Sequence, residues 1–206
     1  MYALVKDNTI QQIITSPKSI VIDDVRYPAK IFSLWSTSEL NAIGIYEVET
    51  NSTNFKNEQW YINTNESYAF ADNRVTRSWG TATAKAHADT LYTSQDDTDG
   101  LIPDGKSVGD IAVEGLKTQL IKSLKQQVAD DLSKTDWYIT RKSEKSTAIP
   151  SAISTHRDAV RTKQAEMETA ITNASDTPAL ETLYTYTEQD DGSVTRPLGE
   201  LPRLES

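Results

Sequence analysis

The sequence predicts an α+β protein, with a β-rich N-terminal module of short antiparallel strands and a C-terminal helical hairpin or small helical module. In the first part of the chain, short runs of β-branched and aromatic residues stand between turn-forming Asn, Asp and Pro residues. After Val113 the apolar spacing changes from about two residues to about 3.6. We therefore expect a β-rich module over residues 1–92, an acidic linker over 93–110, a helical module over 111–187 and an extended tail over 188–206.

Composition restricts the partners and the compartment. The net charge of −9 repels phosphate backbones and anionic lipids, so we expect neither a nucleic-acid nor a membrane partner. The chain has no cysteine, which excludes disulfides, thiolate nucleophiles and cysteine-ligated metals and is typical of a reducing cytoplasm. Lys6 and Asp7 interrupt the first apolar residues, so no signal peptide is predicted.

The first residues predict a hairpin followed by two further strand pieces. Residues 2–5 and 10–14 are short apolar runs on either side of a turn at Asp7 and Asn8. Residues 19–27 contain two further strand pieces around a pair of aspartates.

A short helix is expected directly after Trp35. Ser36 and Glu39 have the spacing of a capping box, and Trp35 and Leu40 occupy the positions of a hydrophobic staple. Gly44 can end this helix in the left-handed conformation, and a strand then follows over residues 45–48. Trp35 is either this staple in a small core or an anchor for a partner.

Residues 50–77 alternate aromatic and polar side chains and predict short antiparallel strands. Two interpretations of the aromatic residues remain open. The alternation is typical of a half-buried sheet, whereas Trp60, Tyr61 and Tyr68 together could also form a stacking surface for a sugar or a base.

An Ala-rich stretch and an acidic stretch follow. Residues 82–91 predict a brief helix, and residues 93–110 predict the linker. The acidic run before Gly100 resembles a calcium loop, but placing Gly100 at the sixth position puts Gln95 first and Lys106 twelfth. Because those positions need Asp and Glu, we expect a solvated loop and no metal site.

Two long helices are predicted in the C-terminal part. The first covers residues 113–132, whose apolar residues share one face. The second begins near Ser151, because Pro150 cannot lie in a helix interior. Its apolar positions, mostly seven residues apart, favour either antiparallel pairing with the first helix or self-association of the chain. A third, short helix is predicted to begin at Pro178.

No catalytic motif was found. The only histidines, His87 and His156, fall in separate predicted elements, and no nucleophile-base pattern or phosphate-binding glycine loop is present. Neighbouring carboxylates such as those of Asp130 and Asp131 diverge on a helix and are expected to be solvated. We therefore expect no enzymatic activity, no catalytic residue and no cofactor.

The joint between the two long helices is the predicted interaction site. Residues 141–163 carry a net charge of +4 in an otherwise acidic chain and follow Trp137 and Tyr138. Such a patch favours an acidic protein partner. The alternative is that Arg157 and Arg161, four residues apart, line a solvated helix face.

This joint also carries a family resemblance. Its residues Thr135-Asp136-Trp137, Arg141, Ile149-Pro150, Arg157 and Arg161 resemble the C-terminal regions of the tail-assembly and tail-fibre-assembly chaperone families of tailed bacteriophages. His156 stands where those families usually have an aromatic residue, mostly Tyr. Residues 1–6 and 27–46 also look like small tail proteins encoded beside fibre genes.

The resemblance implies a role in tail assembly. Members of these families assist the folding, trimerisation or attachment of a tail fibre, in the host cytoplasm during assembly, and some remain on the virion. The expected partner is a phage tail fibre or another tail protein. The alternatives are a permanent component of the tail, baseplate or fibre attachment, and a carbohydrate-binding module. The residues expected to bind the partner are Trp137, Tyr138, Arg141, Ile149, Pro150, His156, Arg157 and Arg161.

Overall fold

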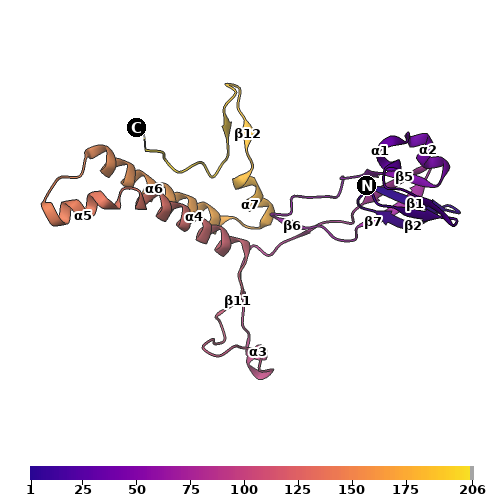
Figure 1. Ribbon diagram of the computed structural model, residues 1–206. Coiled ribbons are helices and arrows are strands. Elements are labelled where there is room, and N and C mark those ends of the chain that lie inside the picture. Colours follow the sequence, from indigo (N-terminus) through magenta and orange to yellow (C-terminus); the bar gives the residue numbers. More distant parts are fainter. Residues whose placement is uncertain (205–206) are drawn as a thin grey trace. The chain divides into compact units, whose positions relative to one another are not determined.

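The computed structural model describes residues 1–204 and has the predicted α+β fold class (Figure 1). Strands predominate in the N-terminal part, and the four long helical segments lie in the C-terminal part. The chain divides into two compact units, Met1–Thr83 and the residues from Ala84 onward. The division therefore falls before the predicted linker, at a position different from the predicted end of the first module at residue 92.

The first unit is built on one five-stranded sheet. Its order is β2-β1-β5-β8-β7, formed by β1 (Tyr2–Lys6), β2 (Thr9–Ile14), β5 (Ile45–Thr50), β7 (Ser67–Ala71) and β8 (Arg74–Ser78). The predicted β1-β2 hairpin is confirmed, and Asp7 and Asn8 have positive φ angles of 51° and 58° in its turn. That conformation matches the twist of a two-residue hairpin and suits short polar side chains.

One strand pair differs from the prediction of antiparallel strands throughout. β5 and β8 are parallel, with Val48 opposite Val75 and Glu49 opposite Thr76. A parallel pair requires a long crossover, and here it includes β6 (Tyr61–Ile62) and β7. Local alternation cannot reveal this direction, because a strand shows the same period whichever way its neighbour runs.

Both faces of the sheet are covered by apolar side chains. On one face Tyr2 and Leu4 pack with Ile14, Ile45 and a buried cluster that includes residues of α1 (Ile31–Leu34) and α2 (Thr37–Ala42). On the other face Ala3 and Val5 pack with Val75. Successive side chains of β1 thus enter two different cores, as the two-residue period of a strand requires.

The predicted helix start before α2 is confirmed. The Ser36 hydroxyl accepts from the Glu39 N–H, and the Glu39 carboxylate accepts from the Ser36 N–H at 2.7 Å. Trp35 is half-buried against the same core as Leu40 and lies edge-on to the ring of Tyr27. This position makes Trp35 part of the small core. The two strand pieces predicted over residues 19–27 are also present, and they pair as the antiparallel strands β3 (Ile20–Ile22) and β4 (Val25–Tyr27).

The second unit contains an antiparallel helix pair, α4 (Leu116–Ser133) and α6 (Ser151–Asn173). Contacts run in opposite directions along the two helices: Lys117 donates to the Thr172 carbonyl, and Lys125 pairs with Glu168. The predicted apolar stripes are buried between them, with Leu124, Val128, Val160 and Ile171 among the most enclosed side chains. α5 (Asp136–Lys145) and α7 (Thr177–Tyr184) complete the helices.

The helix predicted for residues 82–91 is wrong. This stretch is extended and contains only the short strands β9 (Thr83–Ala84) and β10 (Thr90–Leu91). Its carbonyl groups accept hydrogen bonds from the first free N–H groups of α4, at Leu116 and Lys117. Those interactions satisfy donors that a helix cannot satisfy internally, and this tertiary gain outweighs the local helix propensity of alanine.

Residues 93–110 form a closed loop. They contain α3 (Ser94–Thr98), whose start is held by a capping box between Thr93 and Asp96. β10 pairs with β11 (Ile111–Val113) at the base of the loop. We refer to residues 90–113 as the arm. Because β11 includes Val113, the first long helix begins three residues later than predicted.

The C-terminal residues are more structured than the predicted extended tail. β12 (Thr187–Glu188) and β13 (Val194–Thr195) form a small hairpin, and Leu198 is buried with its N–H bonded to the Leu183 carbonyl at 3.0 Å. Residues 205–206, the last of the predicted tail, lie outside the described residues. No helix within the described part is long and apolar enough to cross a membrane.

Candidate functional site

The end of α4 is attached to α6 by the buried side chain of Arg157. Arg157 is only 7% exposed, and its Nη1 donates to the Leu132 carbonyl at 2.7 Å and to the Thr135 hydroxyl at 2.6 Å. Its Nη2 lies 2.9 Å from an Asp136 carboxylate oxygen, at the first residue of α5. Arg157 thus satisfies a carbonyl at the C-terminus of α4, where cations are favoured, and fixes the start of α5.

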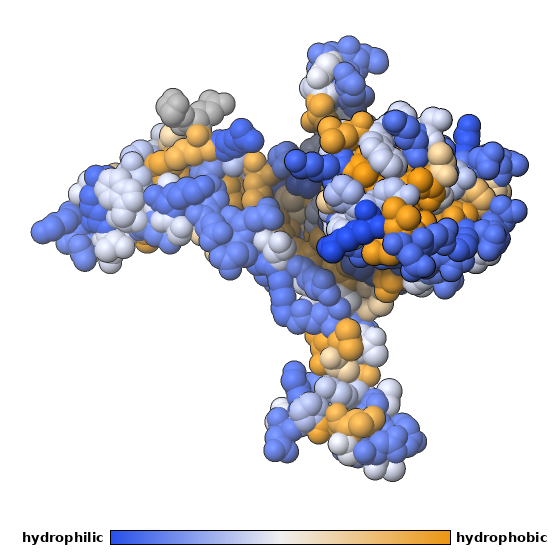
Figure 2. All heavy atoms as spheres, turned by 45° about the vertical axis from the view of Figure 1, so that its right-hand side comes forward, coloured by the Kyte–Doolittle hydropathy of each residue, from blue (hydrophilic) through white to orange (hydrophobic). Residues whose placement is uncertain are grey.

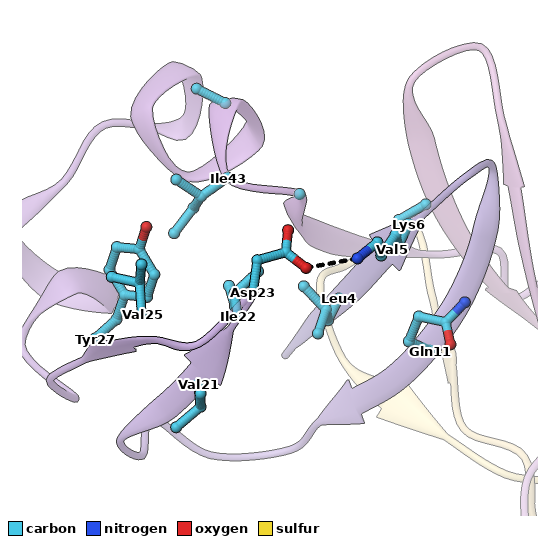
Figure 3. Close-up of a pocket in the computed structure, with 12 residues that line it drawn as sticks. Leu4, Val5, Lys6, Gln11, Val21, Ile22, Asp23, Val25, Tyr27 and Ile43 are labelled. Carbon is cyan, nitrogen blue, oxygen red and sulfur yellow. Dashed lines mark hydrogen bonds and ion pairs between the residues drawn. The ribbon is translucent and has the colours of Figure 1, made fainter.

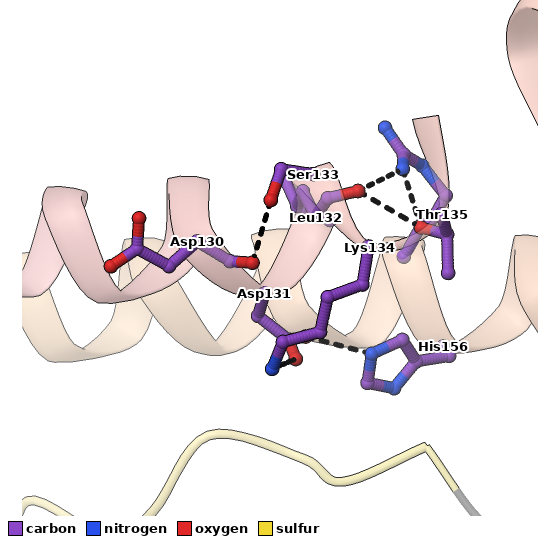
Figure 4. A network of polar contacts seen from close by, with 8 residues as sticks. Asp130, Asp131, Leu132, Ser133, Lys134, Thr135 and His156 are labelled. Carbon is purple, nitrogen blue, oxygen red and sulfur yellow. Dashed lines mark hydrogen bonds and ion pairs between the residues drawn. The ribbon is translucent and has the colours of Figure 1, made fainter. Parts of the chain in front are cut away.

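His156 makes a second attachment beside it. Its Nε2 lies 2.8 Å from one carboxylate oxygen of Asp131, and the other oxygen of that carboxylate accepts from Lys134 at 3.1 Å (Figure 4). Burial alone would raise the pKa of the Asp131 carboxyl. Hydrogen bonds and charge from Lys134 and His156 outweigh that effect, and the pKa is lowered.

The side chains of Trp137, Tyr138 and Arg141 form a stacked group on α5, which we call the α5 cluster. The two aromatic rings have centroids 3.7 Å apart, and the Arg141 guanidinium carbon lies 4.8 Å and 5.2 Å from the Trp137 and Tyr138 centroids. Trp137 is 51% exposed, and the neighbouring Ile139 is 44% exposed. A guanidinium over aromatic faces is held by cation–π attraction, so the cluster keeps an ordered yet accessible apolar surface.

The segment between α5 and α6 is shaped by two residues. Ser146 ends α5 in the left-handed conformation at φ 57°, and Pro150 has an extended backbone directly before α6. Trp137 and Tyr138 lie in the first turn of α5, and the connection between α5 and α6 contains neither of them. Ile149 is half-buried, whereas Pro150 is exposed.

The eight predicted partner-binding residues therefore separate into groups. In the α5 cluster Trp137 is exposed and Tyr138 and Arg141 are half-buried, whereas Arg161 is exposed beside Asp158. His156 and Arg157 are buried and hold α4 against α6 instead. Their role in partner binding stays a prediction; what the structure gives them is burial and hydrogen bonds inside the fold.

The first unit contains a pocket that the sequence did not indicate (Figure 3). It has a volume of about 440 Å³ and is lined by apolar side chains including Leu4, Ile22, Tyr27 and Ile43. An ion pair between Lys6 and Asp23, at 2.5 Å, lies at its edge. Its lining comes from β1, the β3-β4 hairpin and the end of α2, and only the fold brings these segments together.

The aromatic residues considered for sugar stacking differ in accessibility. Trp60 and Tyr61 are 2% and 5% exposed, respectively, so their faces are not open to a ligand. Tyr68 is half-buried, and its hydroxyl donates to the Glu66 carboxylate. Within residues 1–204, no three His, Asp or Glu side chains are grouped as metal ligands would be.

Comparison with known proteins adds no identification. No protein-family model matches the chain, and no curated protein or solved structure is significantly similar to it. The class that the fold defines is an α+β protein of two units with a candidate protein-binding surface on α5.

Proposed function

We propose that this chain is a non-enzymatic phage tail protein that binds a tail fibre, or a related tail component, and assists its folding or attachment. The proposal combines the resemblance of residues 135–161 to tail-fibre-assembly chaperones with one structural observation. That observation is the α5 cluster, in which the exposed Trp137 is stacked with Arg141, and both are of the residue types that dominate protein interfaces.

The physical role follows from the surface of an intertwined fibre. Before its chains are in register, such a fibre exposes apolar side chains and unpaired strand edges, both of which promote aggregation. An ordered aromatic surface can cover them without a catalytic step. The proposed site of action is the host cytoplasm during assembly.

Co-expression tests the proposal. The fibre gene of the same phage is expressed alone, with this protein, and with its Trp137→Ala variant, and the soluble fraction of fibre is measured. We expect the wild-type protein to raise that fraction and the variant to raise it less. A fibre whose solubility does not depend on this protein would exclude the chaperone role.

Mass spectrometry of purified virions distinguishes a transient assembly factor from the second proposed role, a permanent tail or baseplate component. Presence of the protein in stoichiometric amounts would support a permanent component. Absence from particles, together with increased fibre solubility, would support a transient assembly factor.

A further inference from the structure

The arm exposes apolar side chains without a partner in its own unit. Leu91, Leu101, Val108, Ile111 and Val113 are between 37% and 65% exposed, and no side chain of residues 90–113 is buried. Orange residues are visible on this segment at the bottom of Figure 2. Exposed apolar groups gathered on one element of a soluble protein mark an interaction surface.

The arm nevertheless has a defined backbone. The Tyr92 N–H donates to the Asp110 carbonyl and the Gly109 N–H donates to the Tyr92 carbonyl, each at 2.9 Å. The Leu101 N–H donates to the Asp96 carbonyl at 2.8 Å, directly after α3. At the base, Asp89 accepts from the Gly115 N–H at 2.7 Å and from the Thr118 hydroxyl at 2.8 Å. These hydrogen bonds hold the arm in one shape before it meets a partner.

The charge of the arm identifies a complementary surface. The arm carries five aspartates and one lysine, a net charge of −4. On α5 the cations Arg141, Lys142 and Lys145 stand against Glu144, while Asp136 is paired with the buried Arg157, so the helix presents a net charge of +2. This positive surface lies beside the exposed Trp137 and Ile139. Both surfaces thus pair accessible apolar groups with opposite charge, which is the complementarity that orients protein association.

The two surfaces are anchored at opposite ends of α4 in this fold. The base of the arm is bonded to the N-terminus of α4, and α5 begins beyond its C-terminus. α4 has 18 residues, so at about 1.5 Å per residue the two ends are roughly 27 Å apart. Each copy therefore presents both surfaces at once, at opposite ends of one helix.

We infer that the chain associates head to tail with itself, with the arm of one copy docking on α5 of a second copy. The occupant of the exposed arm is thus another copy of this protein. Because the two contacting surfaces differ, the contact forms either a closed ring or an open chain. This inference does not depend on fibre binding, although a partner bound to α5 would compete with the arm.

Sedimentation velocity of the full chain tests the inference. We expect the weight-average sedimentation coefficient to rise with protein concentration and to fall when salt is raised from about 50 to 500 mM, because salt screens the charge contact. An α5 variant, Lys142→Glu with Lys145→Glu, should weaken association roughly 10-fold, since both exposed lysines would then repel the arm. An arm variant, Asp99→Lys with Asp104→Lys, should do the same. The control variant, Lys18→Glu with Lys30→Glu, changes exposed lysines of the first unit and should leave association unchanged.

Mixing the two defective variants gives the decisive result. The intact arm of the α5 variant can dock on the intact α5 of the arm variant, so the mixture should form dimers and nothing larger. A wild-type chain that remains monomeric at every concentration would overturn the inference, as would a mixture without dimers or a control variant equally impaired. These measurements use no fibre, so their failure is distinct from failure of the proposed function.

Discussion

Arg157 and Arg161 lie one turn apart on α6, yet their environments differ completely. Arg157 is buried and makes three polar contacts with the end of α4 and the start of α5. Arg161 has a 52% exposed side chain and one contact, 3.5 Å from Asp158. Spacing alone had suggested one solvated face for both residues.

Replacing Arg157 should therefore destabilise the helical unit. In Arg157→Met, the Leu132 carbonyl and the Thr135 hydroxyl lose their charged donor, and we expect a loss of about 2–3 kcal/mol in the free energy of unfolding. Urea denaturation followed by helical circular dichroism measures it. Arg161→Met is the matched control and should change stability by less than about 0.5 kcal/mol. Equal effects of the two substitutions would contradict the assigned roles.

Trp137 is expected to act in binding and not in stability. In Trp137→Ala the affinity for the fibre should fall by about 2 kcal/mol, the loss of a binding anchor, while the melting temperature changes little because the side chain is 51% exposed. Calorimetric titration and a thermal melt give the two values. Leu34→Ala, at a 74% exposed apolar residue of the first unit, should alter neither quantity. A lowered melting temperature with unchanged affinity would instead make Trp137 a core residue.

Asp131 should make the helical unit sensitive to acid. Its pKa is lowered in the folded state, so the ionised carboxylate stabilises the fold above its unfolded pKa of about 4. That contribution is lost as the pH falls through the lower, folded pKa. The free energy of unfolding measured from pH 6 to pH 2 should show this loss, and Asp131→Asn should flatten the profile. Asp130→Asn, one residue away and exposed, serves as the control; a profile unchanged by Asp131→Asn would refute the argument.

At the scale of elements, the sequence predicted the helices and strands whose turns and caps are formed by residues close together in the chain. Asp7 and Asn8 predicted the first hairpin, and Ser36 and Glu39 predicted the start of α2, because the turn and the cap each lie within a few residues. The parallel β5-β8 pair and the extended residues 82–91 were missed. Their hydrogen-bond partners lie more than 20 residues away, so no neighbouring side chain indicates them.

The start of α4 offers a test of such a distant contact. Gly115 precedes the helix and has no side chain to cap it, and Asp89 supplies the acceptor instead. Asp89→Ala should lower the free energy of unfolding of the helical unit by about 1 kcal/mol, the usual effect of a lost N-terminal cap. Asp104→Ala, at an exposed aspartate of the arm, should have no measurable effect. Urea titrations of both variants decide whether Asp89 acts as the cap.

At the scale of the whole molecule, the chain has two units with separate cores. Val75 lies in the core of the first unit and Val160 between the helices of the second, and both are 0% exposed. A chain with two cores need not unfold in a single step.

Differential scanning calorimetry should therefore resolve two transitions. Val75→Ala should lower one of them and Val160→Ala the other, each through a loss of about 2 kcal/mol from buried methyl groups and the cavity left behind. The double variant should show both shifts added. If either substitution displaced every transition equally, the two units would unfold as one.

The sequence by itself determined the fold class, the first hairpin, the two strand pieces after it, the capped helix and the two amphipathic helices. Each depends on hydrophobic periodicity or on contacts within a few residues, and both can be read directly from the order of residues in the sequence. It also indicated residues 135–161 as the predicted interaction site. Only the tertiary structure decided which of those residues are accessible, because burial depends on what packs opposite. Thus Trp137 is 51% exposed on α5, while His156 and Arg157 are buried and hold α4 against α6.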